Sequence, residues 1–425
     1  MTTLSMFPRR MPSKMRSARS ARSALSNLRA IAFATTREQW PPSLAGSTAS
    51  SQTPETKRFR RIQCLARRIS SVKALVLAGG TGSRLRPITY TCSKQLVPLA
   101  NKPVLFYGLE AIAAAGITDV GIIVGDTGPD IREAIGDGSA LGIKPTFIDQ
   151  DAPRGLAHTV LIARDFLGDE PFVMYLGDNV VLGGITDFVN EFRTQDANAM
   201  VLLNQVDDPR QFGVAEVAPD GTLIRLVEKP QNPPSNLALV GVYLFDSSIH
   251  EAVRSIEPST RGELEITDAI QWLIGNGKVV RQHTIDTPWI DTGKLQDLLE
   301  ANRIVLDQIE ESNRGTVDDS SRIEGRVVIA EGAKIIDSTI RGPVVIGPNA
   351  LIERSYVGPY SSIAADAEIV DSEIEHSVLM EGACVRGVTR VVDSLMGRGA
   401  RVVKDESQPS AYRVMVGDTS TVKIP

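Results

Sequence analysis

The chain has 425 residues, 42% of them hydrophobic and 23% charged, which is typical of a soluble globular protein with more than one domain. No apolar run approaches the ~18 residues that span a bilayer, and the net charge of −5 gives no broad basic surface, so neither membranes nor nucleic acid are expected partners. Three widely spaced cysteines, Cys64, Cys92 and Cys384, predict no disulfide framework and favour a reducing, cytoplasmic location.

Residues 1–71 differ from the rest of the chain. They are rich in arginine, serine and alanine, contain few acidic residues and lack sustained apolar periodicity, which predicts a disordered extension. The same composition is typical of an organellar transit peptide. We favour a second interpretation, in which residues 1–71 are translated upstream sequence that is absent from the mature protein, because a recognisable domain begins abruptly at Val72.

Residues 72–310 alternate between strand and helix patterns. We expect strands at Val72–Ala78, Val120–Val124 and Phe172–Leu176, and a helix at Pro103–Ala115. This alternation predicts an α/β domain with a Rossmann-like, mostly parallel sheet covered by helices. Ligands bind beyond the carboxyl ends of such strands, which is where Gly79 and Asp178 fall.

Residues 322–425 carry a different repeat. Ser338, Ser355 and Ser372 lie 17 residues apart, and apolar residues recur every five or six positions. These apolar positions are Ile329, Ile335, Ile340, Ile346, Ile352, Val357, Ile363, Ile369, Ile374, Leu379, Val385, Val391, Met396 and Val402. The spacing predicts a parallel β-helix of hexapeptide-like repeats. Its flat faces suit subunit contacts, so we expect a homo-oligomer.

A glycine-rich turn follows the first expected strand. Gly79, Gly80 and Gly82 would let backbone N–H groups close on phosphate oxygens, and Arg84 adds a planar, permanently charged phosphate ligand. The turn lacks the Gly-Lys-Ser/Thr of a P-loop and the spacing of a dinucleotide fingerprint. A second short segment, Cys92–Pro103, contains Lys94 and follows closely.

These two segments together resemble the signature of the sugar nucleotidylyltransferase family, and the sequence of Ser93–Pro98 resembles that of its thymidylyltransferase branch. Further segments match the family in the same order: Gln150–Ala157, Leu176–Asn179, Phe212–Val214, Val227–Pro230, Arg261–Asp268 and Trp289–Gly293. Taken singly, each could be an ordinary turn or surface charge. Their joint occurrence identifies the chain as a member of the long form, whose C-terminal domain is a left-handed β-helix.

The resemblance implies a role for each matching residue. Gly79, Gly80 and Gly82 would hold the nucleotide, and Arg84 and Lys94 would contact its phosphates. Gln150 would read the pyrimidine edge, with Gly155 permitting close approach. Gly213 and Glu228 would bind the sugar, and Lys229 would hold the sugar phosphate. Arg261 would lie near the sugar-phosphate side of the substrate site, and Asp178 and Asp291 would bind Mg²⁺.

The implied reaction transfers a nucleotidyl group from dTTP to glucose-1-phosphate and releases pyrophosphate. UTP, or another hexose or N-acetylhexosamine phosphate, remains an alternative, because one methyl group on the base is worth only ~1–3 kcal/mol in a pocket. Acyl transfer through the β-helix, with His376 as the base, is a second alternative. A catalytically silent sugar-nucleotide sensor is a third.

Overall fold

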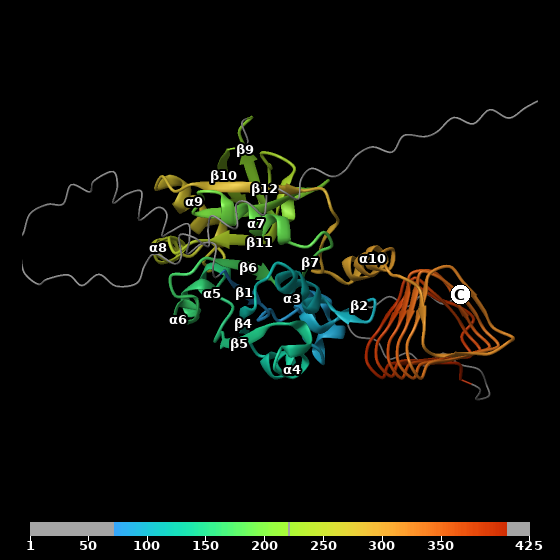
Figure 1. Ribbon diagram of the computed structural model, residues 1–425. Coiled ribbons are helices and arrows are strands. Elements are labelled where there is room, and N and C mark those ends of the chain that lie inside the picture. The colour runs from blue at the N-terminus through green and yellow to red at the C-terminus, as the bar shows by residue number, and fades with distance from the viewer. Residues whose placement is uncertain (1–71, 220–221, 406–425) are drawn as a thin grey trace, which may run out of the picture. The chain divides into compact units, whose positions relative to one another are not determined.

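The computed structural model describes residues 72–219 and 222–405 (Figure 1). All of these described residues belong to one compact unit. The predictions made for residues 1–71, and for the end of the β-helix at 406–425, lie outside the described residues. In the described part, no helix is long and apolar enough to cross a membrane.

Nine strands within the described residues form one mixed sheet, in the order β10-β9-β11-β6-β1-β4-β5, with β8 next to β11 and β12 next to β8. The strands are β1 (Lys73–Leu77), β4 (Asp119–Val124), β5 (Lys144–Asp149), β6 (Phe172–Leu176), β8 (Ala199–Gln205), β9 (Gly213–Val217), β10 (Leu223–Glu228), β11 (Leu237–Phe245) and β12 (Val280–Ile285). Strands β5, β4, β1 and β6 are parallel, whereas β11 runs antiparallel to its neighbours. The predicted α/β sheet is confirmed, with an antiparallel portion that its sequence pattern did not indicate.

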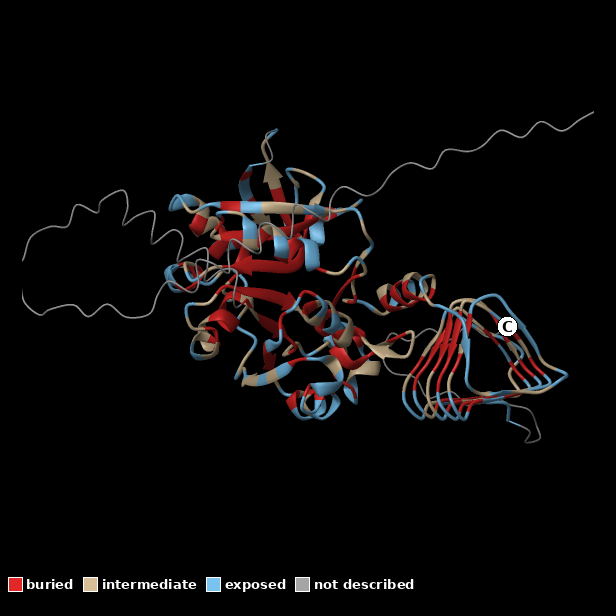
Figure 2. Ribbon diagram, in the orientation of Figure 1, coloured by how far each residue is buried: buried red, intermediate tan, exposed pale blue. Residues whose placement is uncertain are grey.

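Helices cover both faces of this sheet. They are α3 (Val104–Ala114), α4 (Gly128–Ile135), α5 (Leu156–Ile162), α6 (Arg164–Leu167), α7 (Thr186–Thr194), α8 (Ile249–Ser255), α9 (Ile266–Gly275) and α10 (Leu295–Leu306). Short 3₁₀ turns are η1 (Ser83–Leu85), η2 (Ile88–Tyr90), η3 (Lys94–Leu96), η4 (Ser139–Leu141) and η5 (Pro209–Gln211). Along β1, Val76 packs into a core with α3, α4 and α7, and Leu77 into a second core with α5, α8 and α9. Because both faces are covered, β1 reads as a continuous apolar run, and Figure 2 shows the central strands buried.

Two small two-stranded sheets accompany the large sheet. Strands β2 (Pro98–Leu99) and β3 (Lys102–Pro103) form a tight hairpin, and β7 (Asn179–Val181) pairs antiparallel with β13 (Trp289–Asp291). Strands β1 and β6 end side by side, since Leu77 is opposite Leu176. The loops that follow these strands therefore meet at one edge of the sheet.

The β-helix has three faces, and each face is a sheet of parallel strands. The first contains β14 (Ser312–Asn313), β17 (Val327–Ile329), β20 (Val344–Ile346), β23 (Ser361–Ile363), β26 (Val378–Leu379) and β29 (Leu395–Met396). The second contains β15 (Thr316–Val317), β18 (Lys334–Ile336), β21 (Leu351–Glu353), β24 (Glu368–Val370), β27 (Cys384–Arg386) and β30 (Arg401–Val403). The third contains β16 (Arg322–Glu324), β19 (Thr339–Arg341), β22 (Tyr356–Val357), β25 (Glu373–Glu375) and β28 (Val391–Val392).

The apolar repeat lines the interior of the β-helix, as predicted, and consecutive coils are in register at Ile335 and Ile352 and at Ile346 and Ile363. One position differs from the expectation. Val402 is 42% exposed because it lies in the last coil that the structure describes, where no further described coil covers it.

The serines spaced 17 residues apart form a buried ladder at one corner. The Ser355 N–H donates to Ser338 Oγ (3.0 Å), and the Ser372 N–H donates to Ser355 Oγ (3.1 Å). The residues before them, Arg354 and Asp371, have φ of 45° and 49° and turn the corner. A small side chain that both donates and accepts is required there because it satisfies the backbone of the next coil.

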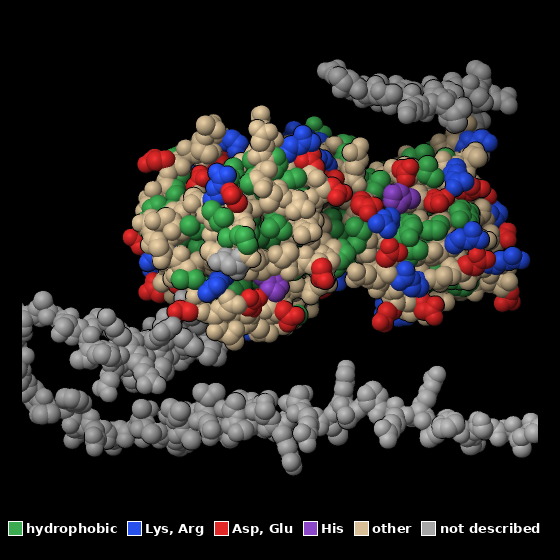
Figure 3. Space-filling view, turned by 90° about the horizontal axis from the view of Figure 1, so that it is seen from above, with side chains coloured by type: hydrophobic (Ala, Val, Ile, Leu, Met, Phe, Trp, Pro, Cys, Tyr) green, Lys and Arg blue, Asp and Glu red, His purple; other side chains and the backbone are tan. Residues whose placement is uncertain are grey.

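Exposed ion pairs connect the coils on the outside. Arg354 Nε lies 2.7 Å from Asp371 Oδ1, and Arg341 Nη2 lies 3.0 Å from Glu324 Oε2. Figure 3 shows basic and acidic side chains interspersed over the β-helix. Each exposed pair contributes only ~0–1 kcal/mol, so the coils are held mainly by the apolar interior and the backbone hydrogen bonds.

Candidate active site

Two carboxylates predicted as metal ligands lie together at the carboxyl edge of the sheet. Asp178 follows β6, and Asp291 ends β13, where it pairs with Asn179. The Thr292 N–H (3.2 Å) and Thr292 Oγ1 (2.8 Å) both donate to the carbonyl oxygen of Asp178. Backbone pairing therefore brings the two carboxylates together, although they are far apart in the sequence.

Lys94 forms an ion pair with Asp178, and Asn179 Nδ2 donates to Asp178 Oδ1 (3.0 Å). Burial on its own raises the pKa of Asp178, but the charge of Lys94, with hydrogen bonds from Lys94 and Asn179, holds that pKa below its usual range. Burial and then the charge of Asp178 raise the pKa of Asp291 to about 6, against smaller opposing effects of Lys94 and Arg84. The site thus holds more negative charge than its protein cations offset.

The glycine turn makes room for Lys94. A Cβ on Gly80 would lie 2.7 Å from Lys94 Cε, and one on Gly82 would lie 2.8 Å from Lys94 Cβ. Gly82 also has a φ of 63°, which favours glycine. These glycines therefore allow the Lys94 side chain to cross the turn and reach Asp178.

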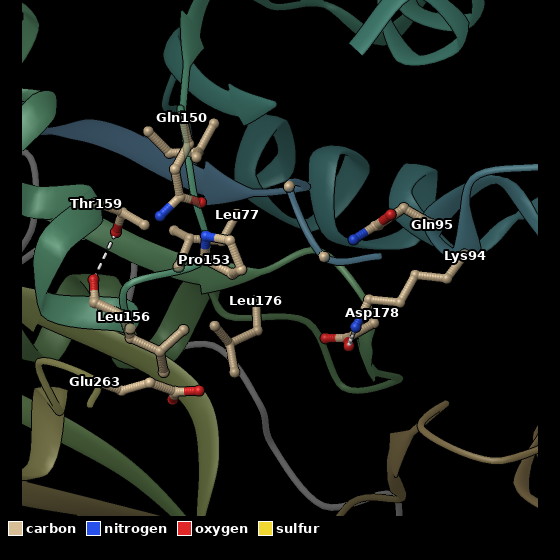
Figure 4. A pocket seen from close by; sticks show the side chains of 14 residues that line it. Leu77, Lys94, Gln95, Gln150, Pro153, Leu156, Thr159, Leu176, Asp178 and Glu263 are labelled. Carbon is tan, nitrogen blue, oxygen red and sulfur yellow. Dashed lines mark hydrogen bonds and ion pairs between the residues drawn. The ribbon is translucent and has the colours of Figure 1, made fainter. Parts of the chain in front are cut away.

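One pocket opens beside this turn, and we call it the first pocket (Figure 4). Its volume is about 700 Å³, including its open mouth. It is lined by Leu77, Gly79, Gly80, Lys94, Gln95, Ile123, Gln150, Pro153, Gly155, Leu156, Thr159, Leu176, Asp178 and Glu263. Gln150 lies at the opposite end from Asp178 and interacts with His158 Nδ1 (3.3 Å). The pocket thus offers an amide at one end and a cation beside a carboxylate at the other.

A second pocket of about 580 Å³ lies on the other side of Leu156 and Leu176, which line both pockets. It is lined by Leu156, Leu176, Asn179, Gln211, Phe212, Gly213, Glu228, Lys229, Leu239, Gly241, Tyr243, Glu265, Ile266, Trp289 and Asp291. Lys229 Nζ lies 3.2 Å from Glu228 Oε1. Asp178 lines the first pocket and Asp291 the second, so the carboxylate pair stands where the two pockets meet.

Arg261 is held by carboxylates rather than left free. Its Nη2 donates to Glu265 Oε1 (2.8 Å) and lies 3.4 Å from Glu228 Oε1. The same loop contacts the segment that lines the first pocket at Gly155 and Leu156, because the Ala157 N–H donates to the Leu264 carbonyl (3.0 Å). A Cβ on Gly155 would lie 2.4 Å from that oxygen, so this glycine is approached by the protein's own backbone.

The other predicted residues are placed as follows. Gly213 is opposite Glu228 in the β9–β10 pairing, and a Cβ there would lie 3.2 Å from Glu228 Oε2. Arg84 is exposed and lines neither pocket, although its charge acts on Asp291. Gly82 and Arg261 also line neither pocket, and the structure brings the other predicted site residues together around the two pockets.

Sequence reasoning missed several lining residues. Gln95 is only 1% exposed and accepts a hydrogen bond from Ser93 Oγ (2.7 Å), and its place next to Lys94 could have indicated it. Glu263 lies in the matching segment Arg261–Asp268 but was given no role. Thr159 and Tyr243 lie outside any recognisable motif, and only the folded chain brings them to the pockets.

His376, the base in the acyl-transfer alternative, lies at a β-helix corner. Its Nδ1 bonds Asp393 Oδ1 (2.6 Å), and its Nε2 is buried with no hydrogen-bond partner among the described residues. Its ring packs edge-on against Tyr360, whose own ring lies 5.8 Å from the Arg303 guanidinium of α10. This position suits a packing residue and not a base that is open to an acyl donor.

The carboxylate pair fits a magnesium ion. Mg²⁺ prefers hard oxygen ligands and is usually held by one or two carboxylates together with water and substrate phosphates. Over residues 72–219 and 222–405, no group of three or more His, Cys, Asp or Glu side chains could hold a metal by itself. The buried, mutually repelling charges of Asp178 and Asp291 would be relieved by a divalent cation, so the donor set suits an ion shared with a substrate.

Comparisons with known proteins agree with this geometry. The profile of the family described as "Nucleotidyl transferase" matches residues 73–308. A glucose-1-phosphate thymidylyltransferase of Streptomyces griseus is 55% identical over 353 residues, covering 83% of this chain and 99% of the relative. A low-salt glycan biosynthesis nucleotidyltransferase of Haloferax volcanii, Agl11, is 46% identical, covering 83% and 100%.

A solved structure is also similar. It is a putative glucose-1-phosphate thymidylyltransferase from Bacillus anthracis in complex with a sucrose, at 36% identity and a TM-score of 0.53. The match covers 57% of this chain and 98% of that one. The extent of these matches, together with the two pockets that meet at a carboxylate pair, shows that the chain belongs to the nucleotidyl transferase family.

Proposed function

We propose that this protein transfers a thymidylyl group from dTTP to glucose-1-phosphate, giving dTDP-glucose and pyrophosphate. The observation that carries the proposal is the carboxylate pair Asp178 and Asp291 at the junction of the two pockets. A two-substrate transfer needs such a junction, because each substrate must reach the reacting phosphorus from its own side. The names of the full-length relatives support the choice of dTTP and glucose-1-phosphate.

In this proposal the nucleotide occupies the first pocket. The Gln150 amide faces the base, and the backbone of Gly79 and Gly80 lies along the phosphates. Lys94 lines this pocket while it pairs with Asp178, so its ammonium group is already beside the position of the α-phosphate. Lys94 would then offset the charge that develops on the phosphates in the transition state.

Glucose-1-phosphate occupies the second pocket. Glu228 accepts hydrogen bonds from sugar hydroxyls, and Lys229 holds the phosphate. A phosphate oxygen attacks the α-phosphorus, a new P–O bond forms, and the bond to the β-phosphate breaks as pyrophosphate leaves with the bonding electrons. A sugar phosphate is already an anion near neutral pH, so the reaction needs positioning and charge neutralisation and no general base.

Asp178 and Asp291 would hold Mg²⁺. Bound there, the ion would supply charge neutralisation for the phosphate oxygens. Residues 72–310 would carry out this chemistry, and the β-helix would have a supporting role.

The test is pyrophosphate release by the full chain with Mg²⁺ and glucose-1-phosphate, comparing dTTP with UTP. We expect turnover with dTTP to exceed turnover with UTP by at least about tenfold, the discrimination that one methyl group can provide. A preference for UTP would support the alternative function, in which the protein uses UTP as its nucleotide. Release with neither nucleotide would contradict the proposal, and acetyl-CoA consumption would favour the acyl-transfer alternative.

A further inference from the structure

Asn302, in α10, is a fully buried polar residue that joins three segments. Its Oδ1 accepts hydrogen bonds from the Ala100 N–H (2.8 Å) and from Ser362 Oγ (2.8 Å). Its Nδ2 donates to the Tyr360 carbonyl (3.2 Å). Asn302 is 0% exposed, so water cannot take the place of any of these hydrogen bonds if one is lost.

The Ala100 bond reaches the segment that carries Lys94. Ala100 and Asn101 form the two-residue turn between β2 and β3, with φ of 47° and 64°. Strand β2 of this hairpin begins at Pro98, two residues after η3 ends, and the Val97 N–H donates to the Lys94 carbonyl (3.4 Å). Asn101 Nδ2 also donates to the Ile363 carbonyl of the β-helix (2.7 Å). The backbone of Lys94 is therefore connected through one short hairpin to Asn302 and to the β-helix.

Helix α10 itself connects to Asp291. It begins at Leu295, just after β13, and the Leu298 N–H donates to the Lys294 carbonyl (3.2 Å). An apolar cluster surrounds this helix and includes residues from η1, the hairpin, β7, β13 and the β-helix. Its buried members are Leu85, Val97, Leu99, Val104, Val180, Ile290, Leu298, Ala301, Val305 and Met380.

We infer that Asn302 is a positioning residue for Lys94 and Asp291, and that the β-helix coil at residues 360–363 is the outer support of the catalytic lysine. The inference rests on the proposed function for the reaction that is measured, and it adds a role for the β-helix within that reaction. A displacement of about 1 Å at a reacting group can lower a rate ~100-fold. A rigid, buried amide behind the hairpin prevents such a displacement.

The competing explanation is that Asn302 only fastens the β-helix to α10. Its neighbour Arg303 provides a matched control, because Arg303 also faces the Tyr360 ring and otherwise pairs with Glu300 and Asp307 on or beside its own helix. Arg303→Ala loosens the contact between α10 and the β-helix and leaves the bond to Ala100 intact. Asn302→Leu removes the bond to Ala100 together with those to Ser362 and Tyr360, and keeps a similar volume.

The experiment measures kcat and KM of the full chain for both substrates, at a temperature where circular dichroism shows each variant fully folded. We expect Asn302→Leu to lower kcat at least about tenfold, with both KM values within about threefold of wild type, because the lost positioning acts on the reacting groups and not on ground-state binding. Arg303→Ala should stay within about twofold of wild type. An equal loss in Arg303→Ala, an unchanged kcat in folded Asn302→Leu, or a change in KM alone would overturn the inference.

A second readout does not depend on activity. Hydrogen exchange should accelerate in peptides covering residues 94–104 in Asn302→Leu but not in Arg303→Ala, because the Ala100 N–H loses its acceptor. Unchanged exchange would overturn the inference even if the wild type released no pyrophosphate, an outcome that would count against the proposed function alone. If Asn302→Leu does not fold, Ser362→Ala replaces it. It should accelerate the same exchange, and its failure to do so would refute the support by the β-helix.

Discussion

Lys94 forms an ion pair with Asp178 that joins the segment after the glycine turn to the end of the central strand β6. The ammonium group lines the first pocket, whereas the carboxylate stands next to Asp291, which lines the second. The pair therefore connects the proposed nucleotide site to the proposed metal site. A substrate phosphate would replace Asp178 as the partner of Lys94, and a cation would replace Lys94 as the partner of Asp178.

Removing the Asp178 charge should abolish turnover. We expect Asp178→Asn to lower kcat at least ~100-fold, because a metal ligand contributes several kcal/mol of transition-state stabilisation. The measurement is pyrophosphate release with dTTP, glucose-1-phosphate and Mg²⁺. Asp187→Asn, an exposed substitution in α7, serves as the control and should be neutral. Near-normal activity of Asp178→Asn would remove this residue from the metal site.

The raised pKa of Asp291 makes a prediction about stability without metal. With a folded pKa of about 6, above its ordinary value of 3.8, Asp291 binds more protons in the folded than in the unfolded chain between these pH values. Its contribution to stability is therefore present below pH 3.8 and lost as the pH rises through 6. In EDTA at pH 7.5, Asp291→Asn should be more stable than wild type by about 1–3 kcal/mol.

The measurement is denaturant unfolding of both proteins in EDTA at pH 7.5 and at pH 4. The difference should shrink at pH 4, where the wild-type carboxyl is mostly protonated in the folded state. Asp291→Asn should also lose activity, since the carboxylate is a proposed metal ligand. A variant less stable than wild type at pH 7.5 would show that Asp291 is not an unfavourably buried charge.

Lys229 should act on the sugar phosphate alone. We expect Lys229→Ala to raise KM for glucose-1-phosphate about 10–100-fold, the effect of losing one hydrogen bond to a charged group, and to leave KM for dTTP within about twofold. Arg225→Ala is the control, because Arg225 lies on β10, the strand that ends just before Lys229, and pairs with Glu216 outside the pocket. An effect confined to dTTP binding would reverse the proposed assignment of the two pockets.

The serine ladder should matter for stability and not for chemistry. Ser355→Ala leaves the buried Ser372 N–H without its acceptor, at a cost of ~1–3 kcal/mol in the free energy of unfolding. Thermal unfolding and kcat would be measured together, with the exposed Ser312→Ala as the control. A stability equal to that of the control would mean that the ladder contributes little, and a large loss of kcat would show that this corner reaches the active site.

The strands and repeats could be predicted because each rests on a local pattern. Strand β1 is apolar at consecutive positions since Val76 and Leu77 enter different cores, and the β-helix repeats because each coil buries one side chain per face. The antiparallel direction of β11 could not be predicted in this way, because a strand buried on both faces has the same pattern in either direction.

The sequence by itself determined which residue types are present for the chemistry: glycines next to a lysine, carboxylates after strands, and a Glu228–Lys229 pair. Only the tertiary structure decided which of them meet. Asp291 reaches Asp178 because β13 pairs with β7 and Thr292 bonds the Asp178 carbonyl across 114 residues of sequence. Such contacts depend on chain topology and side-chain packing, which no local periodicity encodes.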